Sequence, residues 1–240
     1  MSARRARLLG ALLVAATLAA CGGSSSPPDA PDTTATASAT PEPLGTVAGV
    51  DLATEQFDGI EQHGNVLGDP DAKVTLVEYA DLVCTPCAVY SQDVLPQVIE
   101  DHVRSGDVRI ELRPIGIAQE WSTLAAQYAW GAAAQDRMWT FAKLWWANQR
   151  DETTDYVDDA FARRIAEAVP GLDPDQLVDD SRLAETRAQH DDAAQAFLTQ
   201  QLDRVPAFAA GPTGGELEVL DLGETGAQAS RALDHVIAAF

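Results

Sequence analysis

The sequence has few basic residues. Its 240 residues include 16 Lys and Arg against 37 Asp and Glu, which gives a formal net charge of −21. So few cations cannot replace the counterions around nucleic acid phosphates, which argues against nucleic acid binding. The same charge excludes electrostatic adhesion to an anionic membrane surface.

Cysteine is scarce too, with three residues in the whole chain, which excludes a small fold held together mainly by disulfides. The apolar run over 8–20 is shorter than the ~20 residues that a membrane-spanning helix needs. Hydrophobic residues make up 46% of the chain, enough for one globular domain of ordinary size or two small ones.

The first twenty residues have the organisation of an export signal. Three arginines precede the apolar run: Arg4, Arg5 and Arg7. The run ends in Leu18-Ala-Ala-Cys21-Gly22, which resembles a bacterial lipobox. We therefore predict a lipoprotein signal peptide over 1–20, with acylated Cys21 as the membrane anchor. Ordinary cleavage nearby is the alternative, and the sequence does not choose between Sec and twin-arginine export.

The stretch after Cys21 predicts a tether. Residues 22–43 are almost all Ser, Pro, Thr, Ala, Gly and Asp, and none is aromatic. Such a segment cannot bury enough apolar surface to offset the entropy of ordering it. We expect a disordered tether over 21–44 and a folded domain over 45–240.

The folded region opens with a predicted β-α-β unit. Residues 73–80 form a β-rich run in which Val74, Leu76, Glu78 and Ala80 share one face. Residues 84–103 have helical apolar spacing with a kink predicted at Pro96, and 108–115 alternate again as a strand. The two strands should be parallel, with a right-handed crossover.

A helical block follows over 119–203, where the pattern gives no convincing strand. Helices are predicted around 122–134, 137–148, 156–169, 174–180 and 182–203. All five tryptophans lie in 121–146. We expect them to pack this block onto the sheet, with a partner-binding groove as the alternative.

The chain closes with a predicted hairpin and helix. Residues 205–210 and 216–222 read as strands joined by the Gly-rich turn 211–215. Thr225 and Gln228 have the spacing of a capping box, which predicts that the last helix begins there.

The chemistry of the sequence lies in Cys84-Thr85-Pro86-Cys87, at the junction of strand and helix. A thiol at a helix N-terminus has its pKa lowered by the helix dipole and the unpaired N–H groups. Cys87, one turn on, would face inward and resolve a mixed disulfide formed at Cys84. Pro86 restricts the loop between them.

Two other readings of the pair stay open. A structural disulfide closing so short a loop would add little stability through chain entropy. A zinc site needs about four ligands, and the sequence has neither a second Cys-x-x-Cys nor a histidine pair.

Several segments together resemble the DsbA-like branch of the thioredoxin superfamily. They are Gly68-Asp-Pro-Asp-Ala72, Val74-Thr-Leu-Val-Glu-Tyr-Ala-Asp81, Cys84-Thr-Pro-Cys87, Val94-Leu-Pro96 and Val205-Pro-Ala-Phe208. The resemblance covers about residues 65–240. It implies an α/β thioredoxin fold with a central mixed sheet. A helical insertion would lie between the β-α-β unit and the cis-Pro hairpin.

The resemblance also implies residue roles. Cys84 would be the exposed nucleophile and Cys87 the resolving cysteine. Pro206 would be cis, placing Val205 opposite the disulfide to bind an extended substrate chain. Glu78 matches a buried acid that relays protons to the inner cysteine; the alternative is a solvated strand residue.

Thr85 and Pro86, between the cysteines, would complete the substrate-binding surface. The family's best-known oxidases carry a histidine in this position, which is absent here, and Leu82-Val83 supplies no aromatic residue before the pair. The Cys-x-Pro-Cys loop is closer to that of thioredoxin, which favours reduction. The direction of electron flow therefore stays open.

These features predict an extracytoplasmic, lipid-anchored thiol–disulfide oxidoreductase acting on exported proteins, without an organic cofactor or a metal. Oxidation is favoured, because an exported domain lacks the cytosolic glutathione system. A membrane partner would be needed, either a quinone-linked oxidase or a conduit for reductant. The alternatives are a binding lipoprotein with a structural disulfide, and a protein that delivers copper or zinc.

Overall fold

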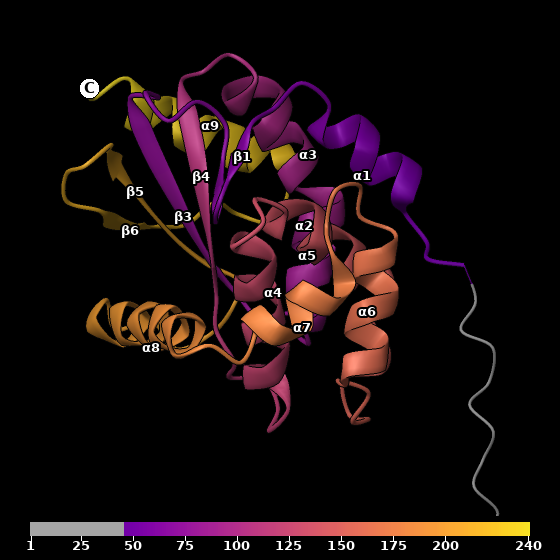
Figure 1. Cartoon of the computed structure of the whole chain (residues 1–240). Coiled ribbons are helices and arrows are strands. Elements are labelled where there is room, and N and C mark those ends of the chain that lie inside the picture. The colour runs from indigo at the N-terminus through magenta and orange to yellow at the C-terminus, as the bar shows by residue number, and fades with distance from the viewer. Residues whose placement is uncertain (1–45) are drawn as a thin grey trace, which may run out of the picture. The chain divides into compact units, whose positions relative to one another are not determined.

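The computed structural model describes residues 46–240 (Figure 1). The predicted signal peptide, Cys21 and the tether over 21–44 lie outside the described residues. The described chain forms a six-stranded sheet with helices around it. The strands are β1 (Gln62–His63), β2 (Val66–Leu67), β3 (Val74–Ala80), β4 (Val108–Pro114), β5 (Ala207–Pro212) and β6 (Glu218–Leu220).

The sheet has the order β1-β2-β4-β3-β5-β6. Strand β3 pairs in parallel with β4 and antiparallel with β5, and every residue of β3 is buried. Glu78 stands opposite Leu112 on one side and Phe208 on the other. The predicted parallel unit, and with it the mixed sheet, is confirmed.

The two faces of β3 are covered by different helices. Phe208, on the face of Glu78, packs against Tyr90 of α2 (Thr85–Asp93) with ring centroids 4.6 Å apart. Tyr79, on the other face, packs against Phe197 of α8 (Ala184–Thr199) at 5.7 Å. Glu78 therefore points to the same side of the sheet as the helix that carries the cysteines.

The helix predicted over 84–103 is interrupted earlier than expected. It is divided into α2, α3 (Leu95–Val98) and the π-helix η1 (Ile99–Val103), and α2 ends at Asp93 with Val94 as its C-cap. Pro96 has no N–H, and its ring would clash with the carbonyl four residues before it, at Gln92. The predicted helical stretch with a disruption caused by Pro96 is thus confirmed, and the interruption falls at Val94, just before the proline.

The helical insertion is confirmed. Between β4 and β5 the structure has only helices: α4 (Ser122–Ala133), α5 (Met138–Ala147), α6 (Asp159–Glu167), α7 (Pro174–Asp180) and α8. Four of the five tryptophans are buried, and Trp121 packs against the core half-buried. The indoles of Trp130, Trp139 and Trp146 donate to the carbonyls of Pro114, Asn65 and Asp81, respectively. The tryptophans thus join the insertion to the sheet layer.

The elements before β3 have no clear signal in the sequence. Helix α1 (Val50–Phe57) buries Ala53 and Phe57, and the Phe57 ring lies 6.5 Å from that of Trp139. Strands β1 and β2 form a hairpin joined by Gly64 and Asn65. Two-residue strands are too short to show the alternation by which a strand is recognised.

The last helix, α9 (Gly226–Ile237), begins as predicted. Thr225 and Gln228 form a complete capping box. The helix packs against α3 and η1. It buries Ala229 and Leu233, and its Ser230 hydroxyl lies 3.0 Å from the His102 ring of η1. It therefore supports the segment that follows the cysteine-bearing helix.

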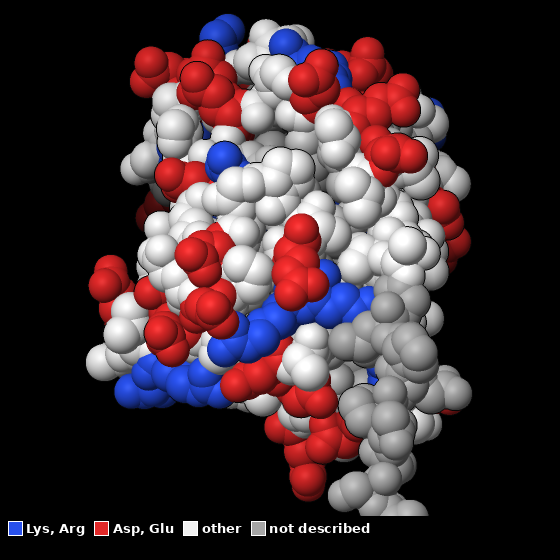
Figure 2. All heavy atoms as spheres, turned by 45° about the vertical axis from the view of Figure 1, so that its right-hand side comes forward, with Lys and Arg blue, Asp and Glu red and all other residues white. Residues whose placement is uncertain are grey.

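The surface is predominantly acidic. On the face shown in Figure 2, Asp and Glu side chains are spread over much of the area, while Lys and Arg gather mainly in its lower part. Within residues 46–240, no helix has both the length and the apolar character that crossing a membrane requires.

Replacing Thr225 with Ala should destabilise the domain by about 1 kcal/mol, because the first turn of α9 loses its side-chain acceptor. Urea unfolding at neutral pH measures this. Thr54→Ala is the matched control: Thr54 is an exposed residue of α1 whose hydroxyl bonds its own helix. Equal losses for the two variants would contradict a role for the cap.

Candidate active site at the Cys84–Cys87 pair

The turn between β3 and α2 is built around Asp81. Its carboxyl group is fully buried and accepts hydrogen bonds from the amides of Val83 at 2.8 Å, Ile117 at 2.9 Å and Ala118 at 2.8 Å. Its backbone carbonyl accepts the amide of Cys84 at 3.2 Å. These bonds fix the turn, so that Cys84 becomes the N-cap of α2.

Both cysteines are free thiols, and both are buried. Cys87 is fully buried, as predicted for the inner cysteine, and Cys84 is only 6% exposed. The prediction of an exposed Cys84 is thus wrong for this state, and the carbonyl of Val205 lies 3.7 Å from its sulfur. Thr85 and Pro86 are exposed and form the outer surface of the motif.

The two thiols differ in acidity. A hydrogen bond from the Cys87 thiol lowers the pKa of Cys84, although burial and the charges of Asp81 and Glu152 oppose this. Burial raises the pKa of Cys87 well above its ordinary value, and its bond to Cys84 adds to this. Cys84 is therefore the sulfur suited to attack and to leave as thiolate, while Cys87 holds its proton.

The loop before β5 faces the pair. The Val205–Pro206 peptide is cis, as predicted. The Sγ of Cys84 donates to the Val205 carbonyl at 3.7 Å. Val205 and Pro206 are both half-buried, so this loop lies beside the sulfur and retains some access to solvent.

Glu78 lies beneath the pair, and its predicted burial is confirmed. It is fully buried on β3, and neither carboxyl oxygen has a hydrogen-bond partner. Burial raises its pKa to about 8, with Lys143 acting in the opposite direction. The charge of Glu78 in turn raises the pKa of Cys87. At neutral pH the carboxyl is mostly protonated and can serve as a proton donor on this side of the sheet.

Lys143 was missed by the sequence analysis. It is buried on α5, and its Nζ donates to the Ser91 carbonyl of α2 at 2.5 Å. Burial lowers its pKa to about 8, against the charges of Glu78 and Asp93. It also lines a pocket of about 770 Å³ together with the exposed residues Gln92 and Asp93. The only signal in the sequence was one charged residue within the run 138–147.

The helical insertion also forms hydrogen bonds with the turn that carries the cysteine pair. Trp146 donates to the Asp81 carbonyl at 3.2 Å, and Gln149 donates to the Val83 carbonyl. Glu152 accepts two hydrogen bonds from Thr85, from the amide at 3.1 Å and from the hydroxyl at 2.7 Å. Residues 146–152 therefore bind the whole turn that presents Cys84.

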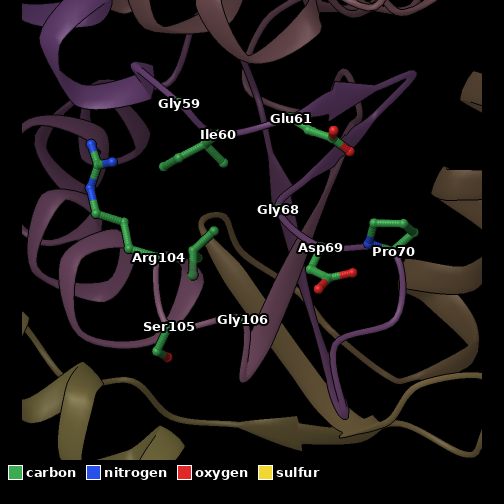
Figure 3. Close-up of a pocket in the computed structure, with 10 residues that line it drawn as sticks. Gly59, Ile60, Glu61, Gly68, Asp69, Pro70, Arg104, Ser105 and Gly106 are labelled. Atoms are coloured by element: carbon green, nitrogen blue, oxygen red, sulfur yellow. The ribbon is translucent and has the colours of Figure 1, made fainter.

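A separate cavity of about 510 Å³ lies where the turn after η1 meets the β1–β2 region (Figure 3). Arg104, on its wall, donates to the carbonyls of Asp58 and Gln56 at the end of α1. None of the residues placed at the redox pair lines it. Its arginine serves to terminate α1.

A comparison with family models decides the family. The model described as thioredoxin matches residues 61–211, which include β3, the cysteine pair and the cis-Pro loop. The chain belongs to the thioredoxin family. Among residues 46–240, no group of three or more His, Cys, Asp or Glu side chains could hold a metal ion.

Curated relatives come from bacilli. The chain is 28% identical over 115 residues to disulfide bond formation protein D of Bacillus subtilis, covering 47% of this chain and 51% of that protein. It is 26% identical over 140 residues to the probable disulfide bond formation protein D of Bacillus cereus, covering 56% and 65%. The match thus spans about half to two thirds of these relatives.

Solved structures show the same fold, and a thioredoxin domain with a helical insertion is thereby confirmed as the architecture. Oxidised BdbD from Bacillus subtilis superposes with a TM-score of 0.65 at 19% identity, covering 75% of this chain and 97% of that one. A thioredoxin-like oxidoreductase from Silicibacter pomeroyi gives 0.57 at 25% identity, covering 73% and 92%. DsbA1 from Wolbachia pipientis gives 0.59 at 18% identity, covering 73% and 91%.

Replacing Glu78 with Gln should remove a pH-dependent loss of stability. Below pH 4.5 the carboxyl is protonated in both folded and unfolded chains, so it costs nothing. Between 4.5 and about 8 the unfolded chain releases the proton that the folded chain keeps, so the unfolding free energy of the wild type falls as pH rises. Relative to E78Q, the wild type should lose roughly 3 kcal/mol between pH 5 and pH 8.

Urea unfolding of both proteins across this range checks the prediction. Glu218→Gln, in the exposed edge strand β6, is the control and should follow the wild type at both pH values. A constant difference between E78Q and wild type from pH 5 to 8 would contradict a raised pKa at Glu78.

Proposed function

We propose that this chain is an extracytoplasmic thiol–disulfide oxidoreductase that introduces disulfides into exported proteins through Cys84 and Cys87. The observation that carries the proposal is the cis Val205–Pro206 loop, whose carbonyl faces the Cys84 sulfur at 3.7 Å. Two thiols whose pKa values are shifted in opposite directions then lie at one helix end, beside a backbone edge that can bind an extended peptide. The names of the bacillar relatives favour disulfide formation over reduction.

In the oxidising direction the cycle begins with the Cys84–Cys87 disulfide. A substrate thiolate attacks the Sγ of Cys84, a mixed disulfide forms, and the bond to Cys87 breaks. Cys87 leaves with the electron pair of that bond. Because burial raises its pKa, it needs a proton, which the protonated Glu78 carboxyl supplies.

The second half of the cycle uses the acidity of Cys84. The other substrate thiolate attacks the substrate sulfur of the mixed disulfide and releases Cys84 as thiolate. The substrate now holds the disulfide, and the enzyme has gained two electrons. A quinone-linked membrane oxidase would remove them and restore the Cys84–Cys87 bond. In the reverse direction, a reductant conduit would supply the electrons.

Substrate would approach from the exposed side of the motif. Thr85 and Pro86 form the outer surface there, and Val205 offers its backbone next to the sulfur. Pro206, held cis, fixes the direction of that carbonyl. Because Cys84 is 6% exposed, the docked peptide must reach the sulfur between these residues.

Anchoring at Cys21 completes the proposal. It rests on the lipobox-like sequence around Cys21 and on the apolar run before it. The anchor would hold the domain at the outer face of the cell membrane, close to its membrane redox partner.

Cys84→Ala should abolish oxidation of a reduced, unfolded protein substrate. Cys87→Ala, mixed with a protein that carries a disulfide, should accumulate mixed disulfides visible on non-reducing gels, because the Cys84 thiolate attacks that disulfide and no second enzyme thiol displaces the substrate. The wild-type pair, equilibrated with glutathione, should have a potential above roughly −200 mV. A potential near about −270 mV with rapid protein disulfide reduction would assign the reductase direction. Failure to exchange with any disulfide would leave a binding lipoprotein, and stoichiometric metal uptake would indicate metal delivery.

Cys21→Ala should move the protein from the membrane fraction to the soluble extracytoplasmic fraction, because the acylated residue is lost. Cell fractionation with immunodetection measures the distribution. Cys84→Ser is the matched cysteine control and should stay in the membrane fraction. Retention of C21A in that fraction would contradict anchoring through this residue.

A further inference from the structure

Glu152 occupies the N-terminus of the helix that carries the redox pair. It lies in the loop between α5 and α6, and is partly buried. Its Oε2 accepts from the Thr85 amide at 3.1 Å and from the Thr85 hydroxyl at 2.7 Å. Thr85 is the residue after Cys84, so a carboxylate from the insertion is held at the first turn of α2.

The first-turn amides of a helix are the groups that stabilise an anion at its N-terminus. A Cys84 thiolate depends on the same amides and on the same end of the helix dipole. Glu152 uses one of these amides and adds a negative charge beside the sulfur. Both effects disfavour the thiolate.

The charged groups acting on Cys84 are Asp81, from the turn after β3, and Glu152, from the insertion, and both oppose its ionisation. They differ in what else they do. Asp81 binds three amides and holds the turn together. Glu152 bonds Thr85 at the helix end, so its charge can be removed while the turn stays intact.

We propose that Glu152 sets the redox poise of the Cys84–Cys87 pair by destabilising the Cys84 thiolate and so favouring the disulfide. The inference rests on the proposed function. Reduction places two electrons on the pair and one proton on Cys87, and leaves the second negative charge on Cys84. The nearby carboxylate repels that charge, so the pair is less oxidising than its helix position alone would make it. Glu152 acts through Cys84 and is therefore a positioning residue.

The test is a charge series at position 152 in the full chain: wild type, Glu152→Gln and Glu152→Lys. Gln keeps an acceptor for Thr85 and removes the charge, while Lys reverses it. Asp155→Asn removes one negative charge from an exposed position of the same loop and serves as control. Absorbance of the thiolate against pH gives the ionisation midpoint of Cys84, and equilibration with glutathione above that midpoint gives the potential.

E152Q should increase the fraction of Cys84 thiolate below the midpoint about fivefold, a size typical of one charge pair near a protein surface. The equilibrium constant with glutathione should shift equally towards the dithiol, which raises the potential by about 20 mV at 29.6 mV per tenfold. E152K should move both quantities further in the same direction, and D155N should match the wild type.

Thiolate midpoints of E152Q and E152K that match D155N would overturn the proposal, as would an order that does not follow the charge at position 152. A thermal melt of each variant confirms that the titrated protein is folded. If one substitution unfolds the chain, the other still gives the sign of the effect. The thiolate titration needs no substrate, so a pair that never exchanges with proteins would refute the proposed function and leave this inference readable.

Discussion

The buried carboxyl group of Asp81 is the constraint on which the site depends. Its bonds to Val83, Ile117 and Ala118 join the end of β3 to the segment that leaves β4. The turn so formed places Cys84 at the start of α2, and the helix then carries Cys87 beneath the surface. Because a buried carboxyl without partners is costly, this complete set of donors holds the turn in one conformation.

Glu78, three residues before Asp81, is also buried but lacks the hydrogen-bond donors that Asp81 has. It has the same kind of carboxyl group, equally buried, and no hydrogen-bond partner for either oxygen. Burial without partners keeps it protonated at neutral pH, whereas the bonds of Asp81 serve structure. One strand end thus supplies a structural acid and a proton-holding acid, and the difference lies in the donors around each.

Much of this active-site arrangement could be predicted from the sequence. The apolar alternation of 73–80 placed Glu78 on a buried face, and the resemblance to DsbA-like proteins implied the cis peptide at Val205–Pro206. The roles of Lys143 and Glu152 could not be predicted, because they depend on contacts with residues more than fifty positions away. The predicted exposure of Cys84 was wrong for the same reason, since Val205, which lies beside its sulfur, is distant in the sequence. Two-residue strands left no periodic pattern to detect.

The insertion also bears on how such a protein can change over generations. The segment from Trp146 to Glu152 forms hydrogen bonds with the active-site turn, yet it belongs to neither the sheet nor the cysteine motif. Its loop after α5 lies at the surface, where length and composition vary most freely among descendants. Substitutions in that loop can therefore alter the reduction potential of the cysteine pair while the core stays unchanged. Lineages sharing one fold and one motif can diverge in redox behaviour through a segment that alignments of the motif would overlook.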